Sequence, residues 1–298
     1  MASGITPSIF ATEWAPGNLQ SEKYLLSLDG IFQKVKQLGS DYVHLVYCWN
    51  FTKDDVPHIQ ELIEKHDVRV SCVHSLTHLN QPSTQEEVEK ERHQLSDAIE
   101  IAQAFDVRLV ACNFGENADR DEIAAIAACK SHYAACFEAA ADAGITIVVE
   151  NTCSASVGGE ITTSAEGIIR LLEGVGSPSF KSQFDAGNLQ SMGEEAYPYA
   201  YELLKEHIRL IHLKDVVKYN PGVSHHRRSE SARKLIGTAA ARYVTVPVGQ
   251  GEVNLEGLLQ GLVADGYEGF VDVEPHTVEE RLDEFYAEGL GFLSHHLS

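Results

Sequence analysis

The sequence predicts an α/β protein that folds as one (β/α)8 TIM barrel. Eight apolar runs of strand length alternate with segments of helical periodicity, and 298 residues suit a barrel, which takes roughly 250 residues or more. Most runs are too continuously apolar for a sheet with one solvated face, so we expect parallel strands buried on both faces. We therefore expect a single domain over residues 1–298. A doubly wound open sheet is the alternative, although no GxGxxG motif follows the first run.

Each predicted strand is a short run rich in aliphatic and aromatic residues. In chain order the runs are SIFATEW (8–14), YVHLVYCW (42–49), RVSCVHS (69–75), RLVACNFG (108–115), ITIVVENT (145–152), KSQFDAGN (181–188), IRLIHLKD (208–215) and GFVDVEP (269–275).

The segments between these runs carry helical signals. Apolar residues recur at steps of three and four in the first segment (Leu28, Ile31, Val35, Leu38) and in the segment after the third strand (Val88, Leu95, Ile99, Ala102). Ser83 and Glu86 predict a capping box at the start of the latter helix. Gly39, Gly144 and Gly266 stand where helices are expected to end.

One connection is far longer than the others. The segment 216–250, after the seventh strand, greatly exceeds the roughly 2–6 residues that are usual in such folds. A long loop in a barrel commonly serves as a lid or a subunit contact, so we interpret 216–250 as a lid or interface insertion. An insertion without a role is the alternative.

Composition limits the partners. The net charge of −21 disfavours nucleic acid and anionic membranes, and favours a small, neutral, carbohydrate-like substrate. No apolar run reaches the ~18 residues of a membrane span, and the N-terminus does not resemble a signal peptide. The six cysteines form no CxxC pair, so we expect reduced thiols in a cytoplasmic protein. Homo-oligomerisation is left open.

Chemically active residues gather at the ends of the last four strands. The candidates are Glu150 on strand five, Asp185 on strand six, His212 on strand seven and Glu274 on strand eight. Active sites of TIM barrels form at this end, and neighbouring strands lie ~4.8 Å apart, so the four side chains can converge. Any one of them alone is more commonly a helix cap or a salt-bridge partner.

A divalent cation would relieve the repulsion among three carboxylates. Oxygen ligands with one imidazole and no thiolate suit Mn²⁺, with Mg²⁺, Co²⁺ and Zn²⁺ as alternatives. We therefore predict one divalent metal ion held by Glu150, Asp185, His212 and Glu274. Asp272 shares the face of Glu274 one step deeper, where it either supports a ligand or forms an internal salt bridge.

Other polar and aromatic residues at strand ends are candidates for substrate binding. They are His74, Asn113, Asn188, Lys214, Trp14 and Trp49. The histidine and the lysine could contact substrate hydroxyls or oxyanions, and the tryptophans could stack on a sugar. The alternatives are a histidine satisfied at the rim, an internal salt bridge and aromatic plugs of the barrel.

Several motifs resemble one known superfamily. They are ENT (150–152), FDAGN (184–188), HLKD (212–215), VGQGEVNLEGLL (248–259) and GYEGFVDVEPH (266–276). Their order and spacing resemble the xylose isomerase-like TIM-barrel superfamily, the group of sugar phosphate isomerases and epimerases. The resemblance implies that Glu150, Asp185, His212 and Glu274 are metal ligands. It also implies that Glu150 and Glu274 are catalytic and move a proton on opposite faces of the substrate.

The expected function is a metal-dependent isomerase or epimerase of a small sugar, keto-sugar or cyclitol that acts through an enediolate. Asn188 stands where many of the epimerases have a histidine, and Lys218 stands roughly where they have a substrate-binding arginine. The main alternative is a dehydratase of the inosose or dehydroshikimate type, because the first half-reaction is shared. A nuclease like endonuclease IV needs more metal ligands and a basic face, and a non-catalytic barrel would not need four ligands.

Overall fold

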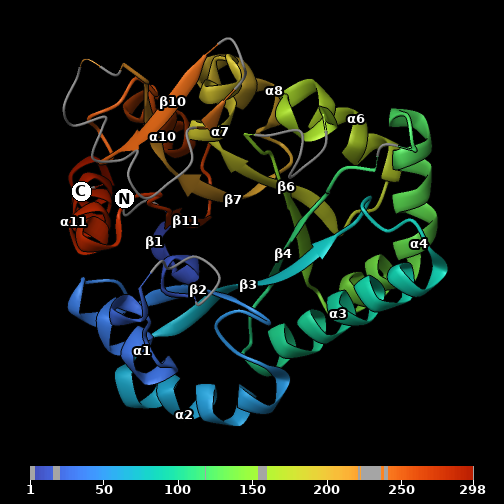
Figure 1. The fold of residues 1–298 in the computed structure, drawn as a ribbon, viewed down its shortest axis with the longest axis horizontal. Coiled ribbons are helices and arrows are strands. Elements are labelled where there is room, and N and C mark those ends of the chain that lie inside the picture. The colour runs from blue at the N-terminus through green and yellow to red at the C-terminus, as the bar shows by residue number, and fades with distance from the viewer. Residues whose placement is uncertain are drawn as a thin grey trace.

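The computed structural model describes residues 4–15, 21–117, 119–153, 160–220, 222, 236–237 and 241–297. Eight parallel strands close into a barrel in the order β1-β11-β7-β6-β5-β4-β3-β2. Helices surround this barrel, as Figure 1 shows for α1 to α4 and α6. The predicted TIM barrel is therefore confirmed, and a doubly wound open sheet is excluded.

The bounds of the elements are as follows. The barrel strands are β1 (Ile5–Phe10), β2 (Tyr42–Val46), β3 (Arg69–His78), β4 (Leu109–Asn113), β5 (Thr146–Glu150), β6 (Phe180–Asp185), β7 (Ile208–Leu213) and β11 (Gly269–Val273). The helices are α1 (Leu28–Gln37), α2 (Val56–His66), α3 (Gln85–Ala104), α4 (Glu122–Asp142), α6 (Ala165–Val175), α7 (Ala186–Met192), α8 (Tyr201–Leu204), α10 (Leu255–Ala264) and α11 (Leu282–Leu297). Short helical turns are η1 (Ala11–Trp14), η2 (Glu22–Tyr24), η3 (Lys53–Asp55), η4 (Glu160–Thr163), η5 (Ala196–Ala200) and η6 (Glu279–Arg281).

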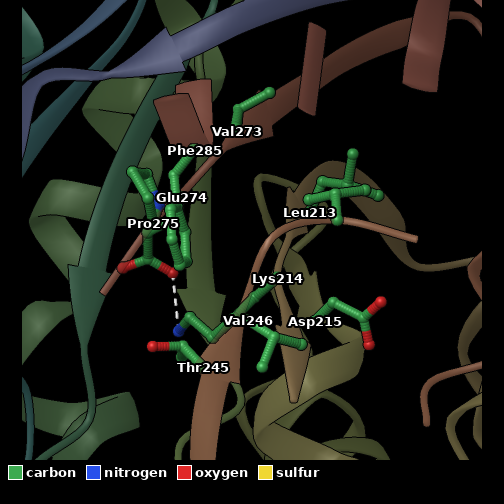
Figure 2. A pocket seen from close by; sticks show the side chains of 10 residues that line it. Leu213, Lys214, Asp215, Thr245, Val246, Val273, Glu274, Pro275 and Phe285 are labelled. Carbon is green, nitrogen blue, oxygen red and sulfur yellow. Dashed lines mark ion pairs between the residues drawn. The ribbon is translucent and has the colours of Figure 1, made fainter. Parts of the chain in front are cut away.

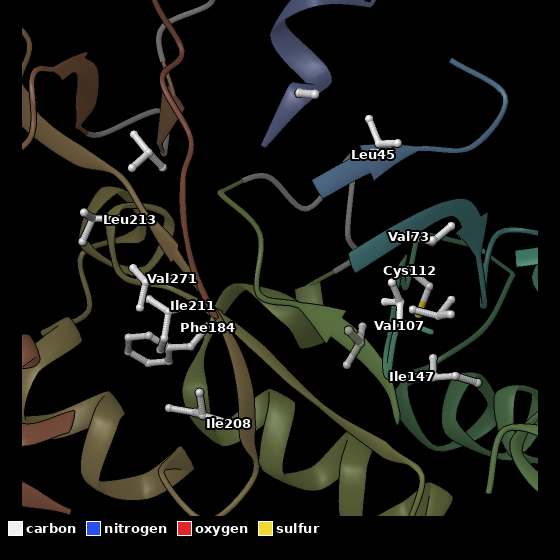
Figure 3. Packing of buried hydrophobic residues seen from close by; sticks show 14 of the residues in the cluster. Leu45, Val73, Val107, Cys112, Ile147, Phe184, Ile208, Ile211, Leu213 and Val271 are labelled. Atoms are coloured by element: carbon white, nitrogen blue, oxygen red, sulfur yellow. The ribbon is translucent and has the colours of Figure 1, made fainter. Parts of the chain in front are cut away.

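The main core lies between the strands and the surrounding helices. It contains alternate residues of neighbouring strands, such as Leu45, Val73, Ile147 and Ile211, all essentially shielded from solvent (Figure 3). A second, smaller cluster holds Cys72, Leu109, Ala111, Val148 and Leu210, with Phe270 packed against it. Side chains alternate across a strand, so this cluster fills the inside of the barrel.

The same alternation carries polar residues up the inside of the barrel. Leu210 of β7 is followed on its face by His212 and then Lys214, and all three are buried. The pairing of β11 with β7 sets Asp272 opposite His212, and the pairing of β6 with β7 sets Asp185 opposite His212. The inner face therefore changes from apolar to charged toward the carboxyl ends of the strands.

Two predicted boundaries need correction. The first strand is Ile5–Phe10 rather than 8–14, because the chain turns into the helical turn η1 at Ala11. The capping box of α3 is formed by Thr84 and Glu87 rather than by Ser83 and Glu86. Threonine and serine are equivalent candidates for this role, and a shift of one residue leaves the pattern intact.

The predicted helix ends are confirmed. Gly39, Gly144 and Gly266 directly follow the C-caps of α1, α4 and α10, and each has a positive φ. Glycine takes this left-handed conformation without a steric penalty. Of the helices in the described ranges, none has the length and hydropathy of a membrane span.

The long connection after β7 contains a small antiparallel sheet. Strand β8 (Asp215–Lys218) pairs with β10 (Arg242–Val246), which also pairs with β9 (Ile236–Gly237). The remainder of 216–250 lies largely outside the described residues, so the lid or interface role of this segment stays a prediction.

Asp215 ties this sheet to the barrel. Its carboxylate accepts hydrogen bonds from the backbone N–H groups of Val216 (2.9 Å), Gly249 (2.9 Å), Gly251 (2.8 Å) and Val253 (3.2 Å). The side chain is almost fully buried, so its carboxylate depends on these four donors rather than on water. Asp215 thereby holds the segment that leads into α10.

Replacement of Gly251 should test this clamp. A Cβ there would lie 1.9 Å from Asp215 Oδ1, whereas a Cβ at Gly291 of α11 would meet nothing within 4 Å. We expect Gly251→Ala to lower the free energy of unfolding by about 2–3 kcal/mol, and the control Gly291→Ala to raise it by about 0.5–1 kcal/mol. Urea denaturation of both variants measures this, and equal stability of the two would contradict the clamp.

Candidate metal centre

Four side chains from neighbouring strands meet at the carboxyl end of the barrel. Glu150 and Asp185 are the last residues of β5 and β6, His212 lies in β7, and Glu274 directly follows β11. Each offers one ligand atom, and these atoms all lie within 4.8 Å of one another. Parallel strands end at the same rim, so consecutive strands bring residues far apart in sequence to one point.

Two nitrogen groups lie among the carboxylates. His212 Nδ1 is 3.0 Å from Glu150 Oε1 and 3.1 Å from Glu274 Oε2. Lys214 Nζ is 2.8 Å from Asp185 Oδ2 and 2.7 Å from Glu274 Oε2. Figure 2 shows the ion pair of Lys214 with Glu274. It lies beside a small cavity that residues of β7, β10 and β11 and Phe285 line. Lys214 is thus paired inside the protein rather than exposed at the rim.

Burial and neighbouring charges together set the pKa values of this centre. Burial raises the pKa of Asp185 to about 6, and the nearby Lys214 only partly offsets it. Burial also opposes the charge on His212, but Glu274 and Glu150 hold its pKa well above the usual range. For Glu274, burial is outweighed by Lys214, His276 and His212, which hold its pKa well below the usual range.

A buried carboxylate supports His212 from below. Asp272 Oδ2 lies 3.6 Å from His212 Nε2 and 2.7 Å from His44 Nδ1, and all three side chains are completely buried. The 3.6 Å contact with His212 Nε2 is longer than a hydrogen bond, so Asp272 acts on this ring through its charge, whereas it forms a hydrogen bond with His44. This arrangement leaves His212 Nδ1 directed at the carboxylates above.

An amide network holds Asp185. Asn151 donates to the carbonyl oxygen of Asp185 (2.8 Å) and accepts from its N–H (2.9 Å). Asn188 donates to the carbonyl oxygen of Asn151 (3.0 Å), and its own Oδ1 accepts from Lys214 Nζ (3.1 Å). Both polar atoms of the Asn188 amide are therefore used within the protein.

Glu274 has a further partner at the rim. Its Oε1 lies 3.1 Å from His276 Nε2, and His276 Nδ1 lies 3.3 Å from Oε1 of the buried Glu13. The two oxygens of Glu274 therefore face different neighbours.

The remaining predicted substrate residues occupy varied positions. His74 is buried in β3, and its Nδ1 accepts from the N–H of Leu76. Trp14 lies in η1 rather than at a strand end, and it packs on Tyr286 with ring centroids 4.9 Å apart. Trp49 follows β2 by three residues and is 39% exposed. Asn113 ends β4 and is half-buried. None of these residues is among the four of the centre.

Sequence reasoning did not identify His44, Asn151 or Glu13. For His44, the alternation within YVHLV offered a signal, because this position falls between two apolar residues of the outer face. Asn151 lies within the ENT motif but had no assigned role. Glu13 carried no signal, because its partner is more than 250 positions away and the contact depends on closure of the barrel.

The donor set fits a divalent cation. Three carboxylates and one imidazole suit a hard or borderline ion, and among the described residues the buried atom Glu150 Oε1 has no hydrogen-bond partner. A cation placed among these atoms would satisfy that oxygen and offset the buried negative charge. The residues present therefore match what such an ion requires.

Comparison with protein families identifies a match over most of the chain. The family model described as xylose isomerase-like TIM barrel matches residues 32–296. No curated protein matches the sequence.

Several solved structures share this fold at low sequence identity. A probable 3-DHS dehydratase from Bacillus anthracis is 14% identical, with 97% of this chain and 98% of that chain covered and a TM-score of 0.71. A 3-keto-D-glucoside 4-epimerase from E. coli is 12% identical, with 98% and 99% covered and a TM-score of 0.72. A D-allulose 3-epimerase from Methylomonas sp., solved in complex with D-allulose, is 14% identical, with 99% and 98% covered and a TM-score of 0.70.

Removal of the Lys214 charge should destabilise the metal-free chain. Lys214→Met leaves Asp185 and Glu274 buried without their shared ammonium, and we expect a loss of about 3–5 kcal/mol in the free energy of unfolding. The control Lys205→Met breaks surface pairs with Glu202 and Asp265, for which a loss of at most about 1 kcal/mol is expected. Urea unfolding with EDTA present measures both, and similar losses would contradict a buried pair.

Proposed function

The chain belongs to the xylose isomerase-like TIM-barrel family, and on that premise we propose that it is a metal-dependent isomerase or epimerase of a small sugar, keto-sugar or cyclitol. One observation carries the proposal: Glu150, Asp185, His212 and Glu274 offer ligand atoms within 4.8 Å of one another at the mouth of the barrel. Epimerases among the structurally similar proteins support the reaction class.

In this proposal the four residues hold one divalent ion, with Mn²⁺ expected and Mg²⁺, Co²⁺ or Zn²⁺ as alternatives. When bound, the ion supplies positive charge that stabilises developing negative charge on substrate oxygens. Asp185 and His212 are buried completely, which suits ligands that take no further part in the chemistry. Asp272 places a buried carboxylate 3.6 Å from His212 Nε2.

Glu150 and Glu274 are the proposed proton carriers. A C–H bond beside a carbonyl is weakly acidic, so its removal needs a positioned carboxylate and a stabilised enediolate. The two glutamates approach His212 Nδ1 from strands that β6 and β7 separate, Glu150 from β5 and Glu274 from the end of β11. One carboxylate would take the proton and the other would return it on the opposite face of the substrate.

The second candidate is a dehydratase. Loss of a β-hydroxyl from the same enediolate uses the same first step, and a probable 3-DHS dehydratase is among the structures that share the fold. Product absorbance separates the two reactions, because an enone absorbs near-ultraviolet light and an epimer does not.

The proposed substrate is a small carbohydrate, and the proposed compartment is the cytoplasm. The net charge of −21 disfavours polyanionic partners. All six cysteines are free, and four of them are buried, which supports a reducing environment.

Metal binding gives the first test. Calorimetric titration of metal-stripped protein with Mn²⁺ should show about one site per chain, and Glu150→Gln combined with His212→Ala should abolish it. Asp97→Asn, a buried carboxylate outside the centre, is the control and should bind normally. Since burial raises the pKa of Asp185 to about 6, protons compete with the ion at lower pH. His212, whose pKa is held well above the usual range, must also lose its proton, so the apparent affinity should fall by at least about tenfold per pH unit as the pH is lowered, and more steeply below pH 6.

Retained binding in the double variant, or affinity that does not change between pH 5 and pH 7, would contradict the assignment of the four ligands.

Hydrogen exchange tests the chemistry. Turnover of a keto-sugar or cyclitol in D2O should place deuterium on the carbon beside the carbonyl, because the enediolate takes its proton from a carboxylate that exchanges with solvent. NMR of a metal-supplemented substrate screen detects this label. Glu150→Gln should lower turnover by about 10²–10⁴-fold. Turnover without any incorporated deuterium would argue against an enediolate.

A further inference from the structure

The two glutamates of the centre have unequal surroundings. Glu274 Oε2 faces Lys214 (2.7 Å) and His212 (3.1 Å), while its Oε1 faces His276 Nε2 (3.1 Å). Glu150 Oε1 has His212 at 3.0 Å as its charged neighbour and no hydrogen-bond partner of good geometry. Glu274 is thus held at both oxygens, and Glu150 is held less firmly.

His276 is itself fixed from several sides. Its Nδ1 lies 3.3 Å from Oε1 of Glu13, which belongs to η1 and is completely buried. Its carbonyl oxygen accepts a hydrogen bond from the Thr245 hydroxyl of β10. The imidazole therefore bridges the turn after β1 and the residue after β11, two segments from opposite ends of the chain whose strands are paired in the barrel.

We propose that His276 is a positioning residue: anchored by Glu13, it holds Glu274 Oε1 so that Oε2 alone faces Asp185, His212 and Glu150. This inference rests on the proposed function, since it assigns a role toward the metal ligands. A side chain held in one rotamer loses less conformational freedom when it binds a ligand, and geometry that is set in advance raises affinity. Within the part of the chain that the structure describes, Glu150 has no corresponding contact with a second histidine.

The competing explanation is that His276 only offsets buried negative charge. Two substitutions separate the explanations. In His276→Gln, the amide nitrogen reaches approximately the place of Nε2 and keeps a donor to Glu274 without the charge. In His276→Asn, the shorter amide keeps a donor near Glu13 but no longer reaches Glu274. If His276 supplies only charge, both variants should bind Mn²⁺ at least as tightly as the wild-type chain, because each removes a positive charge beside the ion. If it positions Glu274, only the second variant should bind more weakly.

The experiment is a calorimetric titration of the full metal-stripped chain with Mn²⁺. We expect His276→Asn to weaken binding by about 10–100-fold, as loss of a residue that orients a ligand usually does, and His276→Gln to restore most of the affinity. Glu13→Gln should weaken binding in the same direction. The pair Glu13→Gln and His276→Asn should be no weaker than His276→Asn alone, because the two residues act as one unit.

Equal affinity of His276→Gln and His276→Asn for Mn²⁺ would overturn positioning. Unchanged affinity in His276→Asn would also overturn it. If His276→Asn does not fold, the opposed expectations for His276→Gln and Glu13→Gln decide the matter. Absence of Mn²⁺ binding by the wild-type chain would instead overturn the proposed function, and this inference with it.

Discussion

The upper part of the barrel depends on the burial of three carboxylates at a single point. Glu150, Asp185 and Glu274 offer oxygens within 4.8 Å of one another, where water can screen them little. Without positive charge beside them, three buried carboxylates would strongly destabilise the folded state. His212, Lys214 and His276 supply the opposing charge, each in contact with Glu274. The three carboxylates with His212 match the metal site proposed for this centre.

Polar side chains replace backbone pairing where the strands end. Parallel strands diverge at the carboxyl rim, so their last N–H and C=O groups lack ladder partners. Asn151 satisfies both backbone groups of Asp185, and Asp215 satisfies four N–H groups of the chain that returns toward α10. The rim is rigid because these side chains bond to main chain rather than to solvent. Fixed geometry matters there, because an error of about 1 Å in a binding site lowers its affinity.

Features that depend on residues close together in the sequence, such as strand faces and helix ends, were predicted correctly. The alternation in IRLIHLKD placed His212 and Lys214 on one face, and glycine ended α1, α4 and α10 as expected. The predicted end of the first strand was wrong because the apolar run continues past Phe10 into η1, and periodicity does not register that change of backbone. The strand pairing within the long connection was missed for a different reason. Its partners β8 and β10 are separated in sequence, so neither segment alone reveals the pairing. The contact of Glu13 with His276 requires the closed barrel, which no local pattern contains.

Two motifs that look independent in the sequence form one packed unit. A Cβ at Gly187 would lie 2.8 Å from the carbonyl oxygen of Lys214 and 2.9 Å from its Cγ, so the glycine of FDAGN makes room for the lysine of HLKD. With that room, the ammonium of Lys214 reaches Asp185 and Asn188 of the same motif and Glu274 across the centre. A larger residue at position 187 would push the lysine away and leave Asp185 buried beside the other carboxylates without its cation. The spacing of these motifs therefore reflects packing as much as chemistry. A barrel that keeps both motifs preserves the charge balance of the centre along with its ligands.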